Sequence, residues 1–331
     1  MRKSRIIATG RYLPPRVVTN FDLMKFMDTS DEWIQQRTGI VERRYVDEGV
    51  GTSDLGAEAS RAALKKAGMD IKDIDLIIFS TLSTDYEFPG CAFFMQEKLG
   101  ADTIGAMDVR TQCTGFLYSL AIADQFIRTG TYDHILVVGG EVHSTGLDFS
   151  TRGRDVTVLF GDGAGAVIVG PTEDGTHLIL STHLHAQGKF AKELWCENPG
   201  SIYNPRISHK MIEDGSVFPK MNGRMVFKHA VERFTEVINE CLEANRYTPQ
   251  DIDLLIPHQA NLRINQFVAS GLGIPDEKVF NNIQRYGNTT AASIPIALDE
   301  ALEQGKIKEG NLVCLAAFGS GFTWASALIR W

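Results

Sequence analysis

The distribution of apolar and polar residues along the chain predicts an α/β protein. Short apolar runs bounded by turn residues indicate buried strands at 73–79, 103–109, 134–141 and 251–258. Longer segments with the periodicity of helices precede the first two runs, at 53–67 and 89–100. Gly68 follows the first of these segments, where a glycine commonly terminates a helix.

The second half of the chain repeats the order of the first. DIDLLIPH at 251–258 matches DIDLIIFS 178 positions earlier, and a helix that opens with Asn288 matches one that opens with Cys113, 175 positions earlier. Each half ends in a Gly-rich segment that predicts a hairpin, at 156–170 and 311–331. The repeat predicts two similar α/β halves, 1–173 and 174–331, packed around a pseudo-twofold axis.

Composition narrows the class of protein. The 331 residues are 44% apolar and 22% charged, with no apolar run long enough for a membrane helix and no signal-peptide pattern. A net charge of −8 argues against a nucleic-acid partner. Five cysteines without CxxC spacing argue against a disulfide framework or zinc site and favour a reducing compartment. We therefore expect a soluble, cytoplasmic protein.

Three polar residues are candidates for a catalytic site. Cys113 stands at the start of a predicted helix, where the helix dipole favours a thiolate and hence a nucleophile. His258 follows the strand of the second half directly, at the end where α/β sites usually form. If the two halves pack face to face, Cys113, His258 and Asn288 should meet in one cleft.

Two other patterns predict structure more than function. GDGAGA at 161–166 resembles a phosphate-binding loop, but it precedes an apolar strand instead of a helix, so we interpret it as a glycine turn between strands. His183 and His185 alternate on a predicted strand and share one face, but two ligands of one type do not define a metal site. No metal is expected.

The motifs QCTGF, PHQAN, YGNTTAASIP and FGSGFTW, in this order and spacing, resemble the thiolase superfamily and, within it, the β-ketoacyl-acyl carrier protein synthase III family. The resemblance extends from GRYLPP near the start to the last residue. It implies a duplicated fold with five layers, αβαβα, usually in a homodimer. It also implies a decarboxylative Claisen condensation that starts fatty acid synthesis, in which an acyl-CoA primer is joined to malonyl-acyl carrier protein with no metal or redox cofactor.

The same resemblance implies the roles of individual residues. Cys113 would carry the acyl group, and His258 and Asn288 would donate hydrogen bonds to the enolate formed on decarboxylation. The backbone N–H groups of Cys113 and Ser320 would form the oxyanion hole. The CoA-binding positions would be Trp33, Arg37, Arg154, Gly223 and Asn261. Phe88 would reach the partner's acyl pocket, and Lys228 and Arg263 would dock an acidic carrier protein.

Several residues depart from the family pattern. Thr111 and Gln112 precede the cysteine where alanines are common, Thr114 replaces a serine, and FGSG replaces FGGG. The 187–222 segment is long, and Glu87 beside Phe88 is an acid that could act as a base. These departures leave open a related condensing enzyme for longer or unusual acyl-CoAs, of the head-to-head or alkylquinolone-forming type.

Two further alternatives belong to other classes. A non-catalytic module that binds acyl-CoA or a carrier protein would not need the intact set of cysteine, histidine and asparagine. A cysteine hydrolase could use the same three residue types. We disfavour the hydrolase because Asn288 and Cys113 are matched in the repeat, as a duplicated condensing fold requires.

Overall fold

The computed structural model describes residues 2–173 and 175–331, and it has five layers. A five-stranded sheet has the order β1 (Lys3–Tyr12), β7 (Gly163–Thr172), β6 (Ile135–Glu141), β4 (Leu76–Ser80) and β5 (Gly105–Val109). A four-stranded sheet has the order β11 (Leu254–Pro257), β12 (Leu312–Gly319), β13 (Thr323–Arg330) and β8 (Leu178–Ala186).

The two sheets share one topology. In the first, β4 and β6 are parallel, and β6–β7 and β7–β1 are antiparallel; in the second, β11 and β12 are parallel, and β12–β13 and β13–β8 are antiparallel. The first sheet adds β5, parallel to β4, as an edge strand. The predicted repeat is therefore present in the pairing of the strands. Residue 174, the predicted start of the second half, lies outside the described residues.

The middle layer consists of α5 (Gly115–Thr129) and α11 (Ser293–Glu303). Both helices contribute to one core cluster with residues from both sheets, such as Ile78 and Ile256. The opposite faces of the sheets carry the outer layers, with α3 (Thr52–Ala67) and α4 (Cys91–Leu99) on the first and α8 (Gly223–Ala244) and α9 (Leu262–Leu272) on the second. The predicted αβαβα order is confirmed.

The predicted strands and helices lie close to their expected positions. Within β4, Ile78 packs toward the middle layer and Ile77 toward α3, which gives a buried strand two apolar faces. Helix α3 ends at Gly68, whose φ of 66° is a left-handed conformation that glycine adopts at low cost.

The 178-residue offset applies to the helices as well as to the strands, which corrects one predicted correspondence. A 3-10 turn at Gln112–Thr114 precedes α5, and a matching turn at Thr290–Ala292 precedes α11. Gln112 and Thr290, 178 positions apart, have φ values of 47° and 48°. The counterpart of Cys113 is therefore Ala291, not Asn288, and the argument against a cysteine hydrolase that rested on that match does not hold.

The predicted hairpin at 156–170 is wrong. Its first part forms the short helix α6 (Arg154–Thr157), and only β7 is a strand. Phe160 instead forms an isolated bridge with Asn288, in the other half of the chain. GDGAGA is accordingly not a turn between two strands: from Gly163 onward it belongs to β7. A Cβ at Gly165 would lie 2.7 Å from the backbone nitrogen of Ile296, so glycine is needed there for α11 to pack against the sheet.

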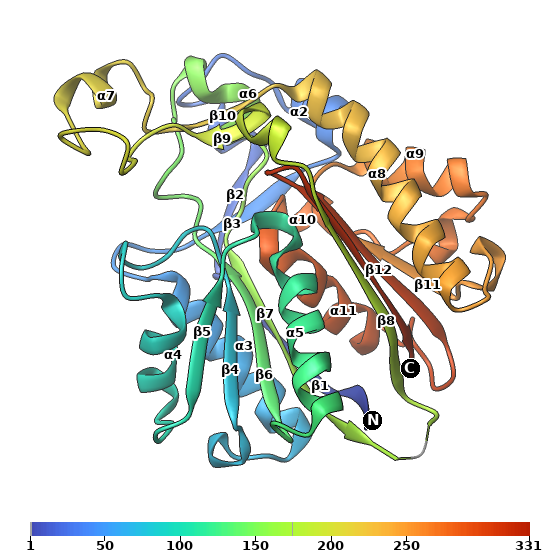
Figure 1. Cartoon of the computed structure of the whole chain (residues 1–331). Coiled ribbons are helices and arrows are strands. Elements are labelled where there is room, and N and C mark those ends of the chain that lie inside the picture. The colour runs from blue at the N-terminus through green and yellow to red at the C-terminus, as the bar shows by residue number, and fades with distance from the viewer. Residues whose placement is uncertain (1, 174) are drawn as a thin grey trace.

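The hairpin predicted at the end of the chain is confirmed, since β12 and β13 pair directly. The long 187–222 segment is more ordered than a simple loop. It contains a 3-10 helix at Gly188–Glu193, the strand pair β9 (Leu194–Cys196) and β10 (Pro219–Met221), and α7 (His209–Glu213). Figure 1 shows α7 at the end of a loop that projects away from the two sheets.

The remaining elements are short strands and α-helices. They are β2 (Arg16–Thr19), β3 (Glu42–Tyr45), α1 (Asn20–Leu23), α2 (Asp31–Thr38) and α10 (Ile283–Tyr286). Within 2–173 and 175–331, no helix is both long and apolar enough to cross a bilayer.

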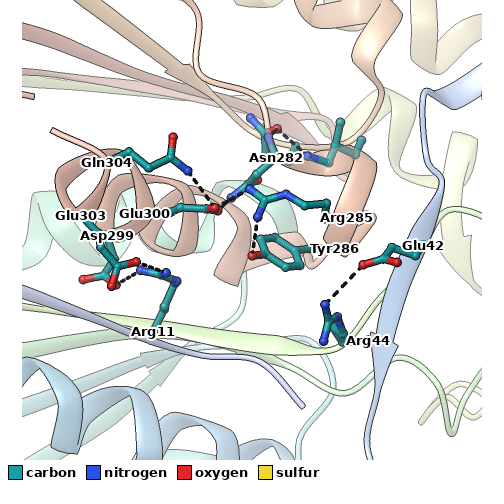
Figure 2. A network of polar contacts seen from close by, with 12 residues as sticks. Arg11, Glu42, Arg44, Asn282, Arg285, Tyr286, Asp299, Glu300, Glu303 and Gln304 are labelled. Carbon is teal, nitrogen blue, oxygen red and sulfur yellow. Dashed lines mark hydrogen bonds and ion pairs between the residues drawn. The ribbon is translucent and has the colours of Figure 1, made fainter. Parts of the chain in front are cut away.

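Two buried acids anchor α11, and one of them, Asp299, connects the two halves (Figure 2). Asp299 accepts hydrogen bonds from Arg11 and Thr9 on β1 and from Lys66 on α3. Its neighbour Glu300 accepts from Asn282 and Arg285 around α10. Because Asp299 is 1% exposed, its charge depends on these partners.

We expect Asp299→Asn to lower the free energy of unfolding by about 3 kcal/mol at neutral pH. Burial raises the pKa of Asp299, but hydrogen bonds from Lys66, Thr9 and Arg11 outweigh it and hold the folded-state pKa below the usual value. The stabilisation is therefore present above the unfolded-state pKa and is lost as the pH falls through the lower folded-state pKa. Urea unfolding across acid and neutral pH measures this.

The matched control is Glu303→Gln, because Glu303 also contacts Arg11 but its side chain is 62% exposed. The Glu303→Gln substitution should lower the free energy of unfolding by less than about 1 kcal/mol. Equal losses for the two variants would contradict the assigned importance of the buried carboxylate.

Candidate active site

Cys113 lies in the 3-10 turn before α5, in close contact with the other half of the molecule. Thr114 ties the turn to β13 through a 2.9 Å hydrogen bond to the hydroxyl of Thr323. Gly319, at the end of β12, is so close that a Cβ there would lie 2.6 Å from the Cβ of Cys113. Glycine at this position therefore allows the second sheet to approach the thiol.

The free thiol is not predisposed to ionise. Burial and, second, the carboxylate of Glu141 raise the pKa of Cys113 to about 12, even though the backbone N–H groups of Ser320 and of Cys113 itself lower it. The expectation that the helix dipole would favour a thiolate is therefore wrong for the unliganded protein. Desolvation of the charged form outweighs the two backbone hydrogen bonds that stabilise the thiolate. The two N–H groups that lower the pKa are those predicted for the oxyanion hole.

Glu141, which the sequence analysis missed, is fully buried at the end of β6. It accepts hydrogen bonds from Thr81, from the backbone N–H of Leu82 and from Ser83. Burial raises the pKa of Glu141 to about 7 despite these bonds. Its charge state thus changes near neutral pH, close enough to Cys113 to affect the thiol.

We expect Glu141→Gln to lower the pH at which Cys113 reacts with iodoacetamide, because the variant removes a carboxylate that disfavours the thiolate. The difference from wild type should be largest above pH 7 and should vanish below it, where Glu141 is protonated. Rates of alkylation against pH, with the exposed Glu58→Gln as control, measure the effect. Identical profiles would contradict it.

His258 is buried directly after β11, and its hydrogen bonds define which ring nitrogen is free. Its Nδ1 lies 2.6 Å from the hydroxyl of Ser293, which also accepts the backbone N–H of Gln259. Ser293 can donate its hydroxyl proton to Nδ1, and in that tautomer the ring proton is on Nε2. Nε2 is buried with no hydrogen-bond partner among the described residues. Burial lowers the pKa of His258 to about 3, so a neutral imidazole offers Nε2–H as a donor.

Asn288 offers a second free donor. Its Oδ1 accepts the backbone N–H of Thr290 at 2.8 Å, so the amide oxygen is committed. Its own backbone pairs with Leu159 and Gly161, which fixes its position. The side-chain NH2 group has no partner within the described part of the chain and is free to donate.

Packing of the two 3-10 turns brings these residues to one region between the halves. Gly115 lies against Ala291, so the turn of Cys113 packs on the turn that follows Asn288. The backbone of His258 donates to Ala316 on β12, the strand that ends at Gly319 beside Cys113. The site is therefore assembled from both halves of the chain.

Cys113 opens onto a cavity of about 940 Å³. Ser320 and Thr290 line it close to the nucleophile, and Leu194, Trp195 and Pro219 line it from the long 187–222 segment. His258 and Asn288 are not part of its wall. His143, which the sequence analysis did not single out, does line the cavity. Its Nε2 atom lies 2.7 Å from the hydroxyl oxygen of Thr290.

Four of the five residues predicted to bind CoA lie together, away from this cavity. Arg37 and Arg154 lie over the ring of Trp33, with guanidinium carbons 4.3 and 5.3 Å from its centroid. Asn261 donates to the backbone oxygen of Arg37 at 2.9 Å. Gly223, the fifth, begins α8. One arginine would have to move for an adenine to stack between it and Trp33.

Phe88 and Glu87 lie on the surface. Phe88 is 81% exposed, and Glu87 forms an ion pair with Arg206 of the long segment. Glu87 therefore does not face the cavity within this chain.

The two predicted docking residues are exposed neighbours on α8 and α9. The guanidinium carbon of Arg263 lies 5.8 Å from the ring centroid of Phe227, next to Lys228. His183 and His185 do share a face of β8, and both contact Glu240. Across the residues that the structure describes, no group of three or more side chains is arranged to hold a metal ion.

The fold and the site together define a class of protein. A duplicated αβαβα fold places a cysteine before a central helix, beside two backbone donors, one neutral histidine and one asparagine amide. This arrangement is that of a thiolase-fold condensing enzyme.

Comparison with known proteins specifies the family. Two family models match, described as 3-oxoacyl-[acyl-carrier-protein (ACP)] synthase III at 107–188 and as its C-terminal part at 242–331. The β-ketoacyl-[acyl-carrier-protein] synthases III of Caldanaerobacter subterraneus and Geobacillus kaustophilus are each 46% identical over 326 residues. The alignments cover 98% of this chain and 97% and 98% of theirs.

Comparison with solved structures supports the same family. The 3-oxoacyl-[acyl-carrier-protein] synthase III of Aquifex aeolicus is 43% identical, with a TM-score of 0.91 over 99% of this chain and 100% of that one. The OleA protein of Xanthomonas campestris, 21% identical over 99% of this chain and 98% of its own, has a TM-score of 0.86 and shares the fold alone. The chain belongs to the β-ketoacyl-acyl carrier protein synthase III family, and it is a condensing enzyme of the acyltransferase type.

Proposed function

We propose that the chain transfers an acyl group from acyl-CoA to Cys113 and then condenses it with malonyl-acyl carrier protein. The observation that carries this is the thiol of Cys113, open to a cavity and next to the N–H groups of Ser320 and Cys113. In acyl transfer, these two N–H groups would stabilise the oxyanion as CoA leaves.

His258 and Asn288 would act in the second step. Loss of CO2 from the malonyl group leaves an enolate, whose oxygen needs donors that are already in position. The Nε2–H of His258 and the amide of Asn288 are unpaired donors of this kind. The enolate carbon then attacks the thioester on Cys113, which releases the thiol and forms the β-ketoacyl product.

We assign CoA to the cluster of Trp33, Arg37, Arg154 and Asn261, with Gly223 at the start of α8. Guanidinium groups can both stack on a purine and face phosphates. Lys228 and Arg263 would receive the acidic carrier protein, by a local and salt-sensitive attraction since the whole chain carries −8. No metal or redox cofactor is needed for these steps.

The remaining assignments concern assembly and location. β5 is an edge strand that pairs only with β4 among the described strands, and Phe88 is exposed, so we propose a homodimer in which Phe88 reaches the partner's acyl pocket. All five cysteines are free, which fits a cytoplasmic location. We place the division between the halves at 173/174, where the strands of the first sheet end.

The alternatives carry less support. Glu87 pairs with Arg206 and is exposed, so it is not placed as the base near the thiol that a head-to-head or alkylquinolone-forming enzyme was expected to have. A non-catalytic binding module would not require the unpaired donors of His258 and Asn288 in addition to the thiol of Cys113.

Intact mass spectrometry tests the proposal. Wild-type protein mixed with acyl-CoAs from acetyl to decanoyl should gain one acyl group from short chains and release CoA. Adducts with long chains only would favour the related enzyme for longer primers. Bound acyl-CoA without CoA release would favour the non-catalytic module.

A further inference from the structure

His143 is a buried residue of the cavity wall that takes no part in the two steps proposed above. It follows β6 by two residues and is 8% exposed. Its backbone N–H donates to the carboxylate of Asp162 at 2.7 Å, and Asp162 also accepts the backbone N–H of Val46. The backbone of His143 is therefore held in place, so its ring can in turn fix the position of the residues that it contacts.

The ring of His143 contacts two residues that hold Asn288 in place. Its Nε2 lies 2.7 Å from the hydroxyl of Thr290, whose backbone N–H donates to Oδ1 of Asn288 at 2.8 Å. Its ring centroid lies 4.5 Å from that of Phe160, which forms the isolated bridge with Asn288. Burial lowers the pKa of His143 to about 3, so the ring is neutral and bonds the hydroxyl whichever of the two atoms donates.

Thr290 has a backbone conformation that its own side chain disfavours. Its φ of 48° lies in the left-handed region, where a residue branched at Cβ is crowded by its backbone. Gln112, its counterpart in the first half, has nearly the same φ, but glutamine is not branched at Cβ and is less crowded there. The hydrogen bond with His143 therefore helps to keep Thr290 in the conformation that directs its N–H at Asn288.

The orientation of the Asn288 amide depends on that N–H group. Because Oδ1 accepts it, the NH2 group faces the other way and is free to donate. The last torsion of an asparagine side chain has broad, roughly two-fold preferences, so the amide turns easily once its oxygen loses this anchor. A turned amide presents an oxygen, which repels an enolate, and a donor stabilises the enolate strongly only when it is already in position.

From these contacts we propose that His143 is a positioning residue for the condensation step, which acts through Thr290 on the amide of Asn288. In this role it does not touch the reacting atoms. Acyl transfer to Cys113 does not use the amide of Asn288, so His143 matters for condensation and not for acylation. The inference rests on the proposed role of Asn288 as a donor to the enolate.

Two variants that remove the hydrogen bond from either side test it. His143→Leu removes the ring nitrogen, and Thr290→Val removes the hydroxyl but keeps the branch at Cβ. Each should lower kcat for condensation roughly tenfold and leave single-turnover acylation of Cys113 by acetyl-CoA and hexanoyl-CoA within about twofold. The double variant should lose no more than the worse single variant, because both remove the same bond. Thr290→Ser, which keeps the hydroxyl, should recover most of the loss seen in Thr290→Val.

The control is His209→Leu, the same change at an exposed histidine of α7 outside the cavity wall, which should leave both steps as in wild type. Additive losses in the double variant would overturn the inference. So would a loss of acylation in His143→Leu that depends on the length of the acyl chain, because His143 would then act as a wall of the acyl site. Normal condensation in His143→Leu and Thr290→Val, with Asn288→Ala impaired, would overturn this inference alone. Normal condensation in Asn288→Ala would overturn the proposed donor role and this inference with it.

Discussion

Cys113→Ala is expected to abolish the acyl-enzyme and to lower the rate of condensation by at least about a thousandfold. The thiol is the only nucleophile beside the paired N–H groups of Ser320 and Cys113 within the described chain, and alanine keeps the backbone that forms them. Intact mass and CoA release measure the first loss, and a coupled condensation assay measures the second.

The same variant carries its own control. His258 and Asn288 are untouched, so Cys113→Ala should retain decarboxylation of malonyl-acyl carrier protein. An acyl adduct that persists in Cys113→Ala would place the nucleophile elsewhere. Cys196→Ala is a matched variant, since Cys196 lines the same cavity but its thiol donates to the backbone oxygens of Asn198 and Val217; the variant should acylate normally.

His258→Ala and Asn288→Ala should each lower condensation by about a hundredfold to a thousandfold while Cys113 is still acylated. The reason is that each variant removes a preorganised donor that acts only on the enolate. The effects should not add in the double variant, because both donors serve one oxygen. Single-turnover acylation and steady-state condensation, measured side by side, separate the two steps.

Gln259→Ala is a useful contrast, because Gln259 is buried next to His258 but its amide is fully committed to the backbone. It should reduce stability and leave the split between acylation and condensation unchanged. Normal condensation in both His258→Ala and Asn288→Ala would contradict the donor roles.

The two halves of the repeat show which structural correspondences can be predicted from the sequence and which cannot. The strands matched at 178 positions because buried apolar runs are similar in both halves. The sequence pattern matches Asn288 to Cys113 because both precede a predicted helix. The backbone shows instead that Ala291 is the structural equivalent of Cys113 in the repeat. Helix starts are poorly fixed by side-chain pattern, since a 3-10 turn and the first turn of an α-helix accept similar residues.

The prediction of a hairpin at 156–170 is wrong for a different reason. Val156 to Phe160 has the apolar pattern of a strand, but Asn288 pairs with Leu159, Phe160 and Gly161 from the other half. A contact across more than 120 residues decides that local structure, and no window of the sequence contains it.

The class of fold, the order of most strands and helices, and the candidates Cys113, His258 and Asn288 can all be predicted from the sequence. Apolar periodicity and ordered motifs carry that information locally. Only the packing of the two halves establishes that the ring nitrogen Nε2 of His258 and the amide of Asn288 have no partner among the described residues, and that the pKa of Cys113 is raised. These properties depend on burial and on partners far away in the chain, because desolvation and hydrogen bonding act through space.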